Sequence, residues 1–309
     1  MLDTAGPNTS GRGFLDALIG AGIFHPSGVA GIYGRSGVFE DVVAGYEQML
    51  LRLGRDATTE TFHFPPGMSR AQFEQTGYMK NFPQLAGSVH SFCGGEHDHM
   101  QLLAELDEGR DWAAKLPATD IVLAPAACYP VYPIIGQRGR LPAAGASIAL
   151  SSYCFRREPS EDPTRMQMFR MREFVRIGTE AQVQEFRQTW MTRALEIAET
   201  LMLPAKLDVA NDPFFGRGGK MLASSQREQA LKLELLIPVT SEDKPTACIS
   251  VNYHQEHFGS ANRIVCADGS PAHSACIGIG VERMALALFR HHGFDVQRWP
   301  EQVRKALWG

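Results

Sequence analysis

The hydrophobic pattern near the start of the chain has helical spacing in two places. In the segment 39–54, FEDVVAGYEQMLLRLG, apolar side chains recur every three or four residues and Gly54 marks a stop. The segment 69–78, SRAQFEQTGY, has a weaker pattern, with Ser69 placed to cap its first turn. Both segments are predicted to be helices.

In the middle of the chain the pattern is typical of strands. The predicted strands are 118–126, 146–158, 166–178, 231–239 and 246–255. The first, ATDIVLAPA, is mostly apolar and is predicted to be a buried strand that ends in a proline-rich turn. The second and third are joined by PSEDPTR at 159–165, which predicts a hairpin with a long loop.

Two further segments have the spacing of helices. Residues 180–203 have a helical pattern that ends before Pro204, and GIGVERMALALFRHHG (278–293) is predicted to be a helix that begins at glycines and stops at Gly293. Central strands with helices on either side predict an α+β fold, built on a largely antiparallel sheet flanked by helices. With no boundary between these segments, 13–309 is predicted to be a single domain.

Composition and charge narrow the class of protein. The chain has 309 residues, 44% of them hydrophobic, and a net charge of −4, so nonspecific nucleic-acid binding is not favoured. It has no apolar run that would span a membrane and no secretory signal, and residues 1–12 are predicted to be a disordered lead. Its six cysteines form no CxxC pair, which favours a reduced, cytoplasmic chain over a disulfide framework.

Positive charge is concentrated between residues 155 and 179. This stretch contains Arg156, Arg157, Arg165, Arg170, Arg172 and Arg176. A cationic sheet surface suits a polyanionic ligand such as a nucleotide triphosphate, because the arginine fork matches phosphate oxygens. The alternative is a solvated face of surface arginines.

One carboxylate lies on the apolar face of the same strand. Side chains alternate along a strand, so Glu173 shares a face with Phe169, Met171, Val175 and Ile177. Burying a bare carboxylate costs several kcal/mol. Glu173 therefore needs a partner, and either an arginine or a metal ion would satisfy it.

Glycines and an arginine come just before the last apolar stripe. Gly278 and Gly280 would let the backbone approach a ligand closely, and a helix terminus favours anions. Arg283 is placed to lay its guanidinium plane on an aromatic base. Core packing explains the two glycines equally well.

In order along the chain, these segments resemble the catalytic core of class II aminoacyl-tRNA synthetases. FRRE (155–158) with its loop and returning strand resembles motif 2 of that class, and GIGVER with MALAL resembles motif 3. GYMKNFPQL (77–85) is a looser match to motif 1, which implies a homodimer with an interface around Pro83.

The similarity is closer to the zinc-dependent, atypical seryl-tRNA synthetase. It is closer still to the truncated relatives of that enzyme, the amino acid:[carrier protein] ligases. This resemblance covers nearly the whole chain through SFCGGE, APAACYP, NDPFFGRGG, ACISVNYHQ and the terminal LWG.

The resemblance implies a zinc site. Cys128, Glu173 and Cys276 match the three protein ligands, and the open fourth position takes the amino group of the substrate. The other cysteines, at 93, 154, 248 and 266, are assigned to packing. The histidines at 97, 99, 291 and 292 are assigned to surface or packing roles.

The resemblance also implies an ATP site with Mg²⁺. Arg156 and Arg283 are expected to be catalytic: Arg156 bridges the α-phosphate and the substrate carboxylate, and Arg283 stacks on adenine. Glu158 is expected to contact the adenine amino group, while Arg165 and Met166 flank the nucleotide, with Arg165 near the terminal phosphates.

A short strand segment completes this expected nucleotide pocket. It consists of Ala247, Cys248, Ile249 and Ser250. Synthetases usually have a glutamate at the position of Ala247, so one expected Mg²⁺ ligand is absent and the magnesium ligands stay open.

The activity implied is ATP-dependent activation of a small amino acid, glycine first and alanine next. The aminoacyl-adenylate then passes its acyl group to the phosphopantetheine thiol of an acidic carrier protein. In segment 213–229, Arg217, Lys220 and Arg227 offer opposite charge for docking, although a solvated loop and helix would have the same composition.

Two other functions are compatible with the same resemblance. The chain would be a true aminoacyl-tRNA synthetase if a separate partner bound tRNA, since the core fills nearly all 309 residues and leaves no room for a tRNA-binding domain. It would be a regulator or sensor if it were an inactive paralogue. The presence of Arg156, Glu158, Glu173, Arg283 and both candidate cysteine ligands argues against an inactive protein.

Overall fold

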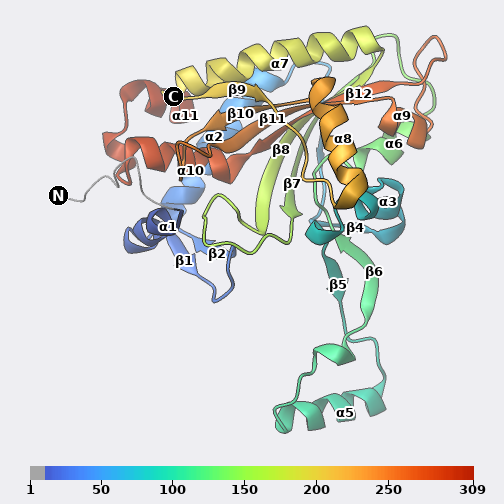
Figure 1. Ribbon diagram of the computed structural model, residues 1–309, viewed down its shortest axis with the longest axis vertical. Helices are drawn as coiled ribbons and strands as arrows, with labels where there is room; N and C mark the ends of the chain where they lie inside the picture. Colours follow the sequence, from blue (N-terminus) through green and yellow to red (C-terminus); the bar gives the residue numbers. More distant parts are fainter. Residues whose placement is uncertain (1–10) are drawn as a thin grey trace.

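A seven-stranded sheet forms the centre of the protein (Figure 1). Its order is β3 (Glu60–His63), β7 (Ala146–Phe155), β8 (Met168–Gly178), β12 (His273–Gly280), β11 (Thr246–Gln255), β10 (Lys232–Ile237) and β9 (Lys206–Val209). All neighbouring strands are antiparallel except the outer pair β3–β7. The prediction of an α+β fold with a largely antiparallel sheet is confirmed.

This computed structural model describes residues 11–309, except for the side chain of Arg217. Most of the predicted disordered lead, 1–12, lies outside the described residues. Its last two residues, Gly11 and Arg12, already belong to helix α1 (Gly11–Gly20). Within the described part of the chain, no helix is long and apolar enough to cross a membrane.

Three long helices pack against one face of the sheet. They are α2 (Gly37–Gly54), α7 (Glu180–Thr200) and α10 (Val281–His292), and α11 (Glu301–Trp308) packs against α2 and α7. Ser36 caps α2 by accepting a hydrogen bond from the backbone N–H of Phe39. Phe174 of β8 stacks on Trp190 of α7 at a centroid distance of 4.7 Å, so this layer forms the main hydrophobic core.

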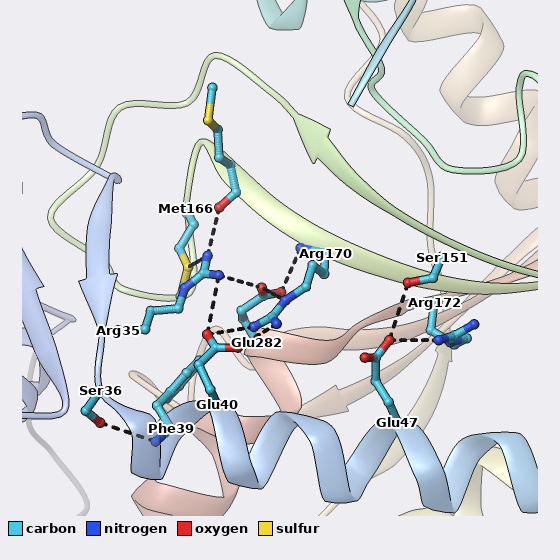
Figure 2. A network of polar contacts seen from close by, with 11 residues as sticks. Arg35, Ser36, Phe39, Glu40, Glu47, Ser151, Met166, Arg170, Arg172 and Glu282 are labelled. Atoms are coloured by element: carbon cyan, nitrogen blue, oxygen red, sulfur yellow. Dashed lines mark hydrogen bonds and ion pairs between the residues drawn. The ribbon is translucent and has the colours of Figure 1, made fainter. Parts of the chain in front are cut away.

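The predicted hairpin is formed by β7 and β8, which pair from Ala146–Ile177 to Phe155–Met168 around the 156–167 loop. Two of its alternating arginines, Arg170 and Arg172, are neither a free cationic surface nor solvated, so both expectations are wrong for them. In Figure 2, Arg170 contacts Glu40 and Glu282, and Arg172 contacts Glu47. These arginines point under α2 and are paired there, because unpaired charge at that depth would be costly.

The two glycines before Arg283 end a strand rather than begin a helix. Gly278 and Gly280 lie in β12, and α10 begins at Val281. A Cβ atom at Gly278 would lie 3.0 Å from the Ser250 hydroxyl oxygen, which is tighter than ordinary packing. The strand assignment was missed because the apolar pattern of β12 runs directly into that of α10.

A small second sheet carries a projecting arm. β4 (Gly67–Ser69), β6 (Ala118–Leu123) and β5 (Ser88–His90) form it, and β5 and β6 lead out to α5 (Glu96–Asp107), which lies away from the rest of the protein in Figure 1. The prediction of a strand in 118–126 is confirmed by β6, but the prediction that it is buried is wrong. No layer covers most of β6, so only Val122 of this strand is buried.

The remaining elements are short. They are the hairpin of β1 (Phe24–Pro26) and β2 (Tyr33–Arg35), and helices α3 (Arg70–Gln75), α4 (Tyr78–Asn81), α6 (Val131–Gln137), α8 (Gly216–Glu228) and α9 (His257–Ala261). The Ser69 hydroxyl caps α3 as predicted, accepting from the Gln72 N–H. The segment matched to motif 1 forms α4 and the single turn Pro83–Leu85, and the homodimer stays a prediction.

Candidate active site

A cavity lies on the face of the sheet opposite α7, and it gathers most of the predicted site residues. Those that line it are Cys128, Arg156, Glu158, Met166, Glu173, Ala247, Cys248, Ile249, Ser250, Cys276 and Arg283. Arg165 lines an adjoining cleft that shares Arg156, Glu158 and Arg283 with the cavity. Residues more than 150 positions apart in the chain thus lie around one space, although their individual roles remain predictions.

The deepest part of the cavity holds a group of three metal-binding side chains. Cys128 comes from the turn after β6, Glu173 from β8 and Cys276 from β12. One ligand atom of each lies within 4.8 Å of the others, and all three residues are at most 6% exposed. In the described part of the chain, this is the one group of three or more such residues with that spacing.

The chemistry of this group fits a cation. One oxygen of Glu173 accepts a hydrogen bond from the Ala127 N–H at 2.9 Å, while the other is buried without a partner. Burial, with the Cys276 sulfur nearby, raises the pKa of Glu173 to about 8. A divalent ion would both pair the free oxygen and favour the ionised carboxylate, and two sulfurs with one oxygen suit zinc.

The two thiols differ in acidity, and side chains not predicted from sequence surround one of them. A hydrogen bond from Cys128 lowers the pKa of Cys276, and the same bond together with burial raises the pKa of Cys128. The Cys276 sulfur also lies 3.5 Å from the Asn252 amide and 3.6 Å from the His254 ring. Asn252 and His254 alternate with Ser250 along β11, a period-2 signal that the sequence does contain.

Two half-buried arginines also line the cavity. The Arg156 Nε donates to the Pro125 carbonyl at 3.2 Å, and its guanidinium lies over the Phe169 ring. Arg283 donates to the carbonyls of Thr164 and Ala247 at 2.9 and 3.0 Å. Arg283 therefore links the 156–167 loop to strand β11.

The adjoining cleft is more open. Arg165 is exposed and lies 3.8 Å from the Glu158 carboxylate. Burial, followed by repulsion from Arg165, lowers the pKa of Arg283. Positive charges held this close favour an anion between them.

The strand segment expected to line the nucleotide pocket contributes mainly backbone and one hydroxyl. Burial raises the pKa of Cys248 to about 12, so its thiol stays neutral in the core. The Ser250 hydroxyl donates to the Gly278 carbonyl at 3.3 Å. Ala247 lines the cavity and has no ligand atom for a metal in its side chain.

A buried charge group beside this strand was not predicted. Lys232 lies 2.5 Å from an Asp212 oxygen and 3.1 Å from a Glu234 oxygen, and all three residues line both the cavity and the cleft. Glu234 lies opposite Ser250 across β10 and β11. Lys232 and Glu234 alternate on a predicted strand, but the sequence does not show that Asp212 meets them.

The remaining cysteines and histidines were assigned to packing or surface roles. Cys154, Cys248 and Cys266 are buried as expected, whereas Cys93 is exposed, which corrects its assignment to packing. The rings of His291 and His292 lie 2.9 Å from the carbonyl oxygens of Pro238 and Leu201, so they bind backbone.

Helix α8 carries the residues expected to dock a partner. Lys220 is exposed, and Arg227 is exposed and donates to the Asn211 side chain at 3.2 Å; the Arg217 side chain is outside the described part. Large apolar side chains are exposed beside them, at Phe215, Met221 and Leu222. On the inner side of the helix, Gln226 bonds Asp212 and lines the cavity.

Sequence comparison relates this chain to two kinds of ligase, although no protein-family model matches it. Amino acid--[acyl-carrier-protein] ligase 2 of Bradyrhizobium diazoefficiens is 50% identical over 293 residues, which are 95% of this chain and 87% of that protein. A type-2 serine--tRNA ligase of Methanopyrus kandleri is 28% identical over 205 residues, which are 62% of this chain and 39% of that protein.

Structure comparison identifies the fold. M. kandleri seryl-tRNA synthetase, solved with A. aeolicus tRNASec, superposes with a TM-score of 0.81 at 21% identity, covering 98% of this chain and 61% of that chain. Seryl-tRNA synthetase of Pyrococcus horikoshii, complexed with ATP, gives 0.69 at 14% identity, covering 95% and 62%. The chain thus spans about three fifths of each synthetase.

These superpositions show the fold of a class II seryl-tRNA synthetase catalytic core, as the sequence resemblance implied. Because half of its residues are identical over nearly its whole length, this chain belongs to the family of amino acid--[acyl-carrier-protein] ligases, enzymes built on that core.

Proposed function

We propose that the protein activates a small amino acid with ATP and transfers it to the phosphopantetheine thiol of a carrier protein. The observation that carries this proposal is one cavity that is lined both by Cys128, Glu173 and Cys276 and by Arg156 and Arg283. An amino acid held by the group of three would direct its carboxylate toward a nucleotide held by the two arginines. The name of the relative that is 50% identical supports the choice of acceptor.

In the first half-reaction, a carboxylate oxygen of the amino acid attacks the α-phosphorus of ATP and pyrophosphate leaves. Arg156 neutralises charge between the two reactants, Arg283 and Met166 enclose the adenine, and Glu158 accepts from its amino group. Positioning and charge neutralisation are enough for such a step. Zinc held by Cys128, Glu173 and Cys276 would supply a Lewis-acid site for the substrate amino group.

In the second half-reaction, the pantetheine sulfur attacks the acyl carbon of the adenylate, forming a thioester and releasing AMP. We assign α8 to carrier docking. Lys220 and Arg227 offer positive charge to an acidic carrier, and Met221 and Leu222 offer apolar surface. Gln226 brings the same helix to the wall of the cavity, so a carrier bound there would have a short route to the adenylate.

Reversing the charge of α8 should separate the two half-reactions. With Arg217, Lys220 and Arg227 all changed to glutamate, we expect carrier aminoacylation to fall at least about tenfold, because electrostatic steering is lost. Pyrophosphate exchange should be unchanged. Both rates are measured on the same preparation at low and at high salt. The difference in carrier aminoacylation between the variant and the wild type should shrink at high salt, because salt screens the charges.

A matched triple variant controls for the change in net charge. Lys206, Arg298 and Lys305 are also exposed, and none of them lies on α8. Changing these three to glutamate should leave carrier aminoacylation as in the wild type. Equal loss of both half-reactions in the α8 variant would remove α8 as the docking helix.

Transfer of radiolabelled glycine decides between the candidate functions. Glycine, ATP and Mg²⁺ are supplied with a phosphopantetheinylated carrier protein and, in parallel, with total tRNA. We expect an acid-stable, thiol-labile label on the carrier and none on tRNA. Label on tRNA alone would make the protein a minimal synthetase, and absence of pyrophosphate exchange with any amino acid would favour a regulator or sensor.

Two finer assignments belong to the same proposal. We place glycine first and alanine second, and competition between them in the exchange assay measures the preference, since one methyl group changes discrimination by roughly 1–3 kcal/mol.

We place the protein in the cytoplasm, which agrees with six free cysteines.

A further inference from the structure

The β1–β2 hairpin contacts the 156–167 loop, a segment more than 120 residues later in the chain. The backbone N–H of Gln167 donates to the Gly31 carbonyl at 2.8 Å, and the Gln167 side chain donates to the Ala30 carbonyl at 2.8 Å. The Tyr33 hydroxyl of the hairpin also donates to the Ser160 carbonyl of the loop at 3.4 Å. The hairpin thus bonds both the middle and the returning end of the loop.

Arg35, the last residue of β2, contacts Met166, which lines the cavity. One of its terminal nitrogens donates to the Met168 carbonyl at 3.2 Å and lies 3.6 Å from the Met166 sulfur (Figure 2). The other lies 3.1 Å from a Glu282 oxygen and 3.8 Å from a Glu40 oxygen. Only 11% of the Arg35 side chain and 2% of the Glu282 side chain are exposed, so the contact between these two is shielded from water.

Glu282 joins Arg35 to helix α10, which also carries Arg283. Its side chain is 2% exposed and bonds both the backbone N–H and the guanidinium of Arg170 at 2.8 Å. The next residue is Arg283, which donates to the Thr164 carbonyl of the same loop. The charge cluster of Arg35, Glu40, Arg170 and Glu282 therefore contacts Met166 through Arg35 and adjoins Arg283 through Glu282. Met166 and Arg283 are the two side chains proposed above to enclose the adenine.

We propose that Arg35 is a positioning residue for ATP: through Met166 and Glu282 it sets the distance between the two walls of the adenine pocket, and the β1–β2 hairpin holds the loop in its binding conformation before the nucleotide arrives. The inference rests on the proposed function for the identity of the nucleotide. A loop of a dozen residues without such contacts would lose conformational freedom on binding, and the affinity for ATP would fall by that cost.

The close fit of the hairpin and the loop agrees with this role. Gly31 has a φ of +77°, which favours glycine. A Cβ atom there would lie 3.2 Å from both the Arg165 carbonyl oxygen and the Gln167 side chain. The backbone of the hairpin and that of the loop therefore meet where a side chain would separate them.

Arg35→Met tests the role of Arg35, because it keeps an unbranched apolar stem and removes the charge and the donors. We expect the KM and the Kd for ATP to rise about tenfold, with kcat of pyrophosphate exchange changed far less, since the lost contacts act on nucleotide binding. Arg35→Lys should recover part of the affinity by restoring charge next to Glu282. Should Arg35→Met fail to fold, Tyr33→Phe is the milder variant and should raise the Kd in the same direction.

Arg172→Met is the matched control. Arg172 lies on the same face of the sheet, pairs with Glu47 at 3.0 Å and is 5% exposed, and like Arg35 it has a buried Nε without a partner. It makes none of the contacts of Arg35 with the loop. We expect the control to lower the melting temperature comparably and to leave the Kd for ATP as in the wild type.

Calorimetric titration with ATP alone measures the Kd of each variant without requiring amino acid activation. The role of Arg35 would be overturned if the Kd for ATP rose equally in Arg35→Met and Arg172→Met, or if it rose in neither. Wild-type protein that binds ATP but performs no exchange would count against the proposed function, and the comparison of Kd values would still decide the inference. Wild-type protein that does not bind ATP would overturn both.

Discussion

Cys276→Ser is expected to abolish stoichiometric zinc binding and amino acid activation together. Cys276 lies with Cys128 and Glu173 at the end of the cavity, and a serine hydroxyl is a much poorer zinc ligand than a thiolate. Substituting a residue that only hydrogen-bonds a metal's ligand already lowers metal affinity or activity by about 10–100-fold. Loss of a ligand itself should therefore lower pyrophosphate exchange by more than about 100-fold.

The measurement pairs metal content with exchange rate on one purified sample. Cys266→Ser is the matched control, because Cys266 is a buried thiol outside the group of three. It should keep one zinc per chain and the exchange rate of the wild type. Full zinc occupancy in Cys276→Ser would mean that the ligand set is wrong, and zinc loss with normal exchange would remove zinc from substrate binding.

Arg156→Lys should give the second large effect, a fall in the exchange rate of about 10²–10³-fold. Lysine keeps the charge but cannot present two parallel N–H groups to the α-phosphate and the substrate carboxylate. Its Nε–H bond to the Pro125 carbonyl, which orients the guanidinium, would also be lost. Because the group acts on the reacting atoms, kcat should fall more than KM rises.

The adjacent Arg157 offers a control in the same stretch of sequence. Its side chain is exposed, so Arg157→Lys should leave both kinetic constants near the wild-type values. Steady-state exchange as a function of ATP and glycine concentration separates kcat from KM. Equal, small effects of the two substitutions would remove Arg156 from the reaction centre.

Both of these residues were found from sequence because short motifs carry them. Arg156 lies in FRRE and Cys276 lies in HSACIGIG, which overlaps the start of GIGVER, and each resembles a motif of the related enzymes. The carboxylate on an apolar strand face indicated an unusual partner for Glu173. Alternation along a strand is a local property, so it correctly separated Glu173 from Arg170 and Arg172. The hairpin, the long helices and the fold class follow from equally local patterns.

The residues that cover each face of a strand come from distant parts of the chain, so the strand's own sequence does not identify them. The sequence placed Arg170 and Arg172 on one face but did not show that Glu40 and Glu47 of α2 would cover them. In the same way, it contained Lys232 and Glu234 without showing that Asp212 completes their charge group.

The sequence by itself therefore determined the fold class and the hairpin, because periodicity and motifs depend on neighbours along the chain. The family resemblance pointed to Cys128, Glu173 and Cys276, which the structure brings together, and their role as zinc ligands stays a prediction. Only the tertiary structure decided which arginines face the cavity and which are buried in ion pairs. It also decided that the β1–β2 hairpin meets the 156–167 loop. Such pairings join residues more than 100 positions apart, and the free energy that selects them comes from burial and charge pairing in the folded protein.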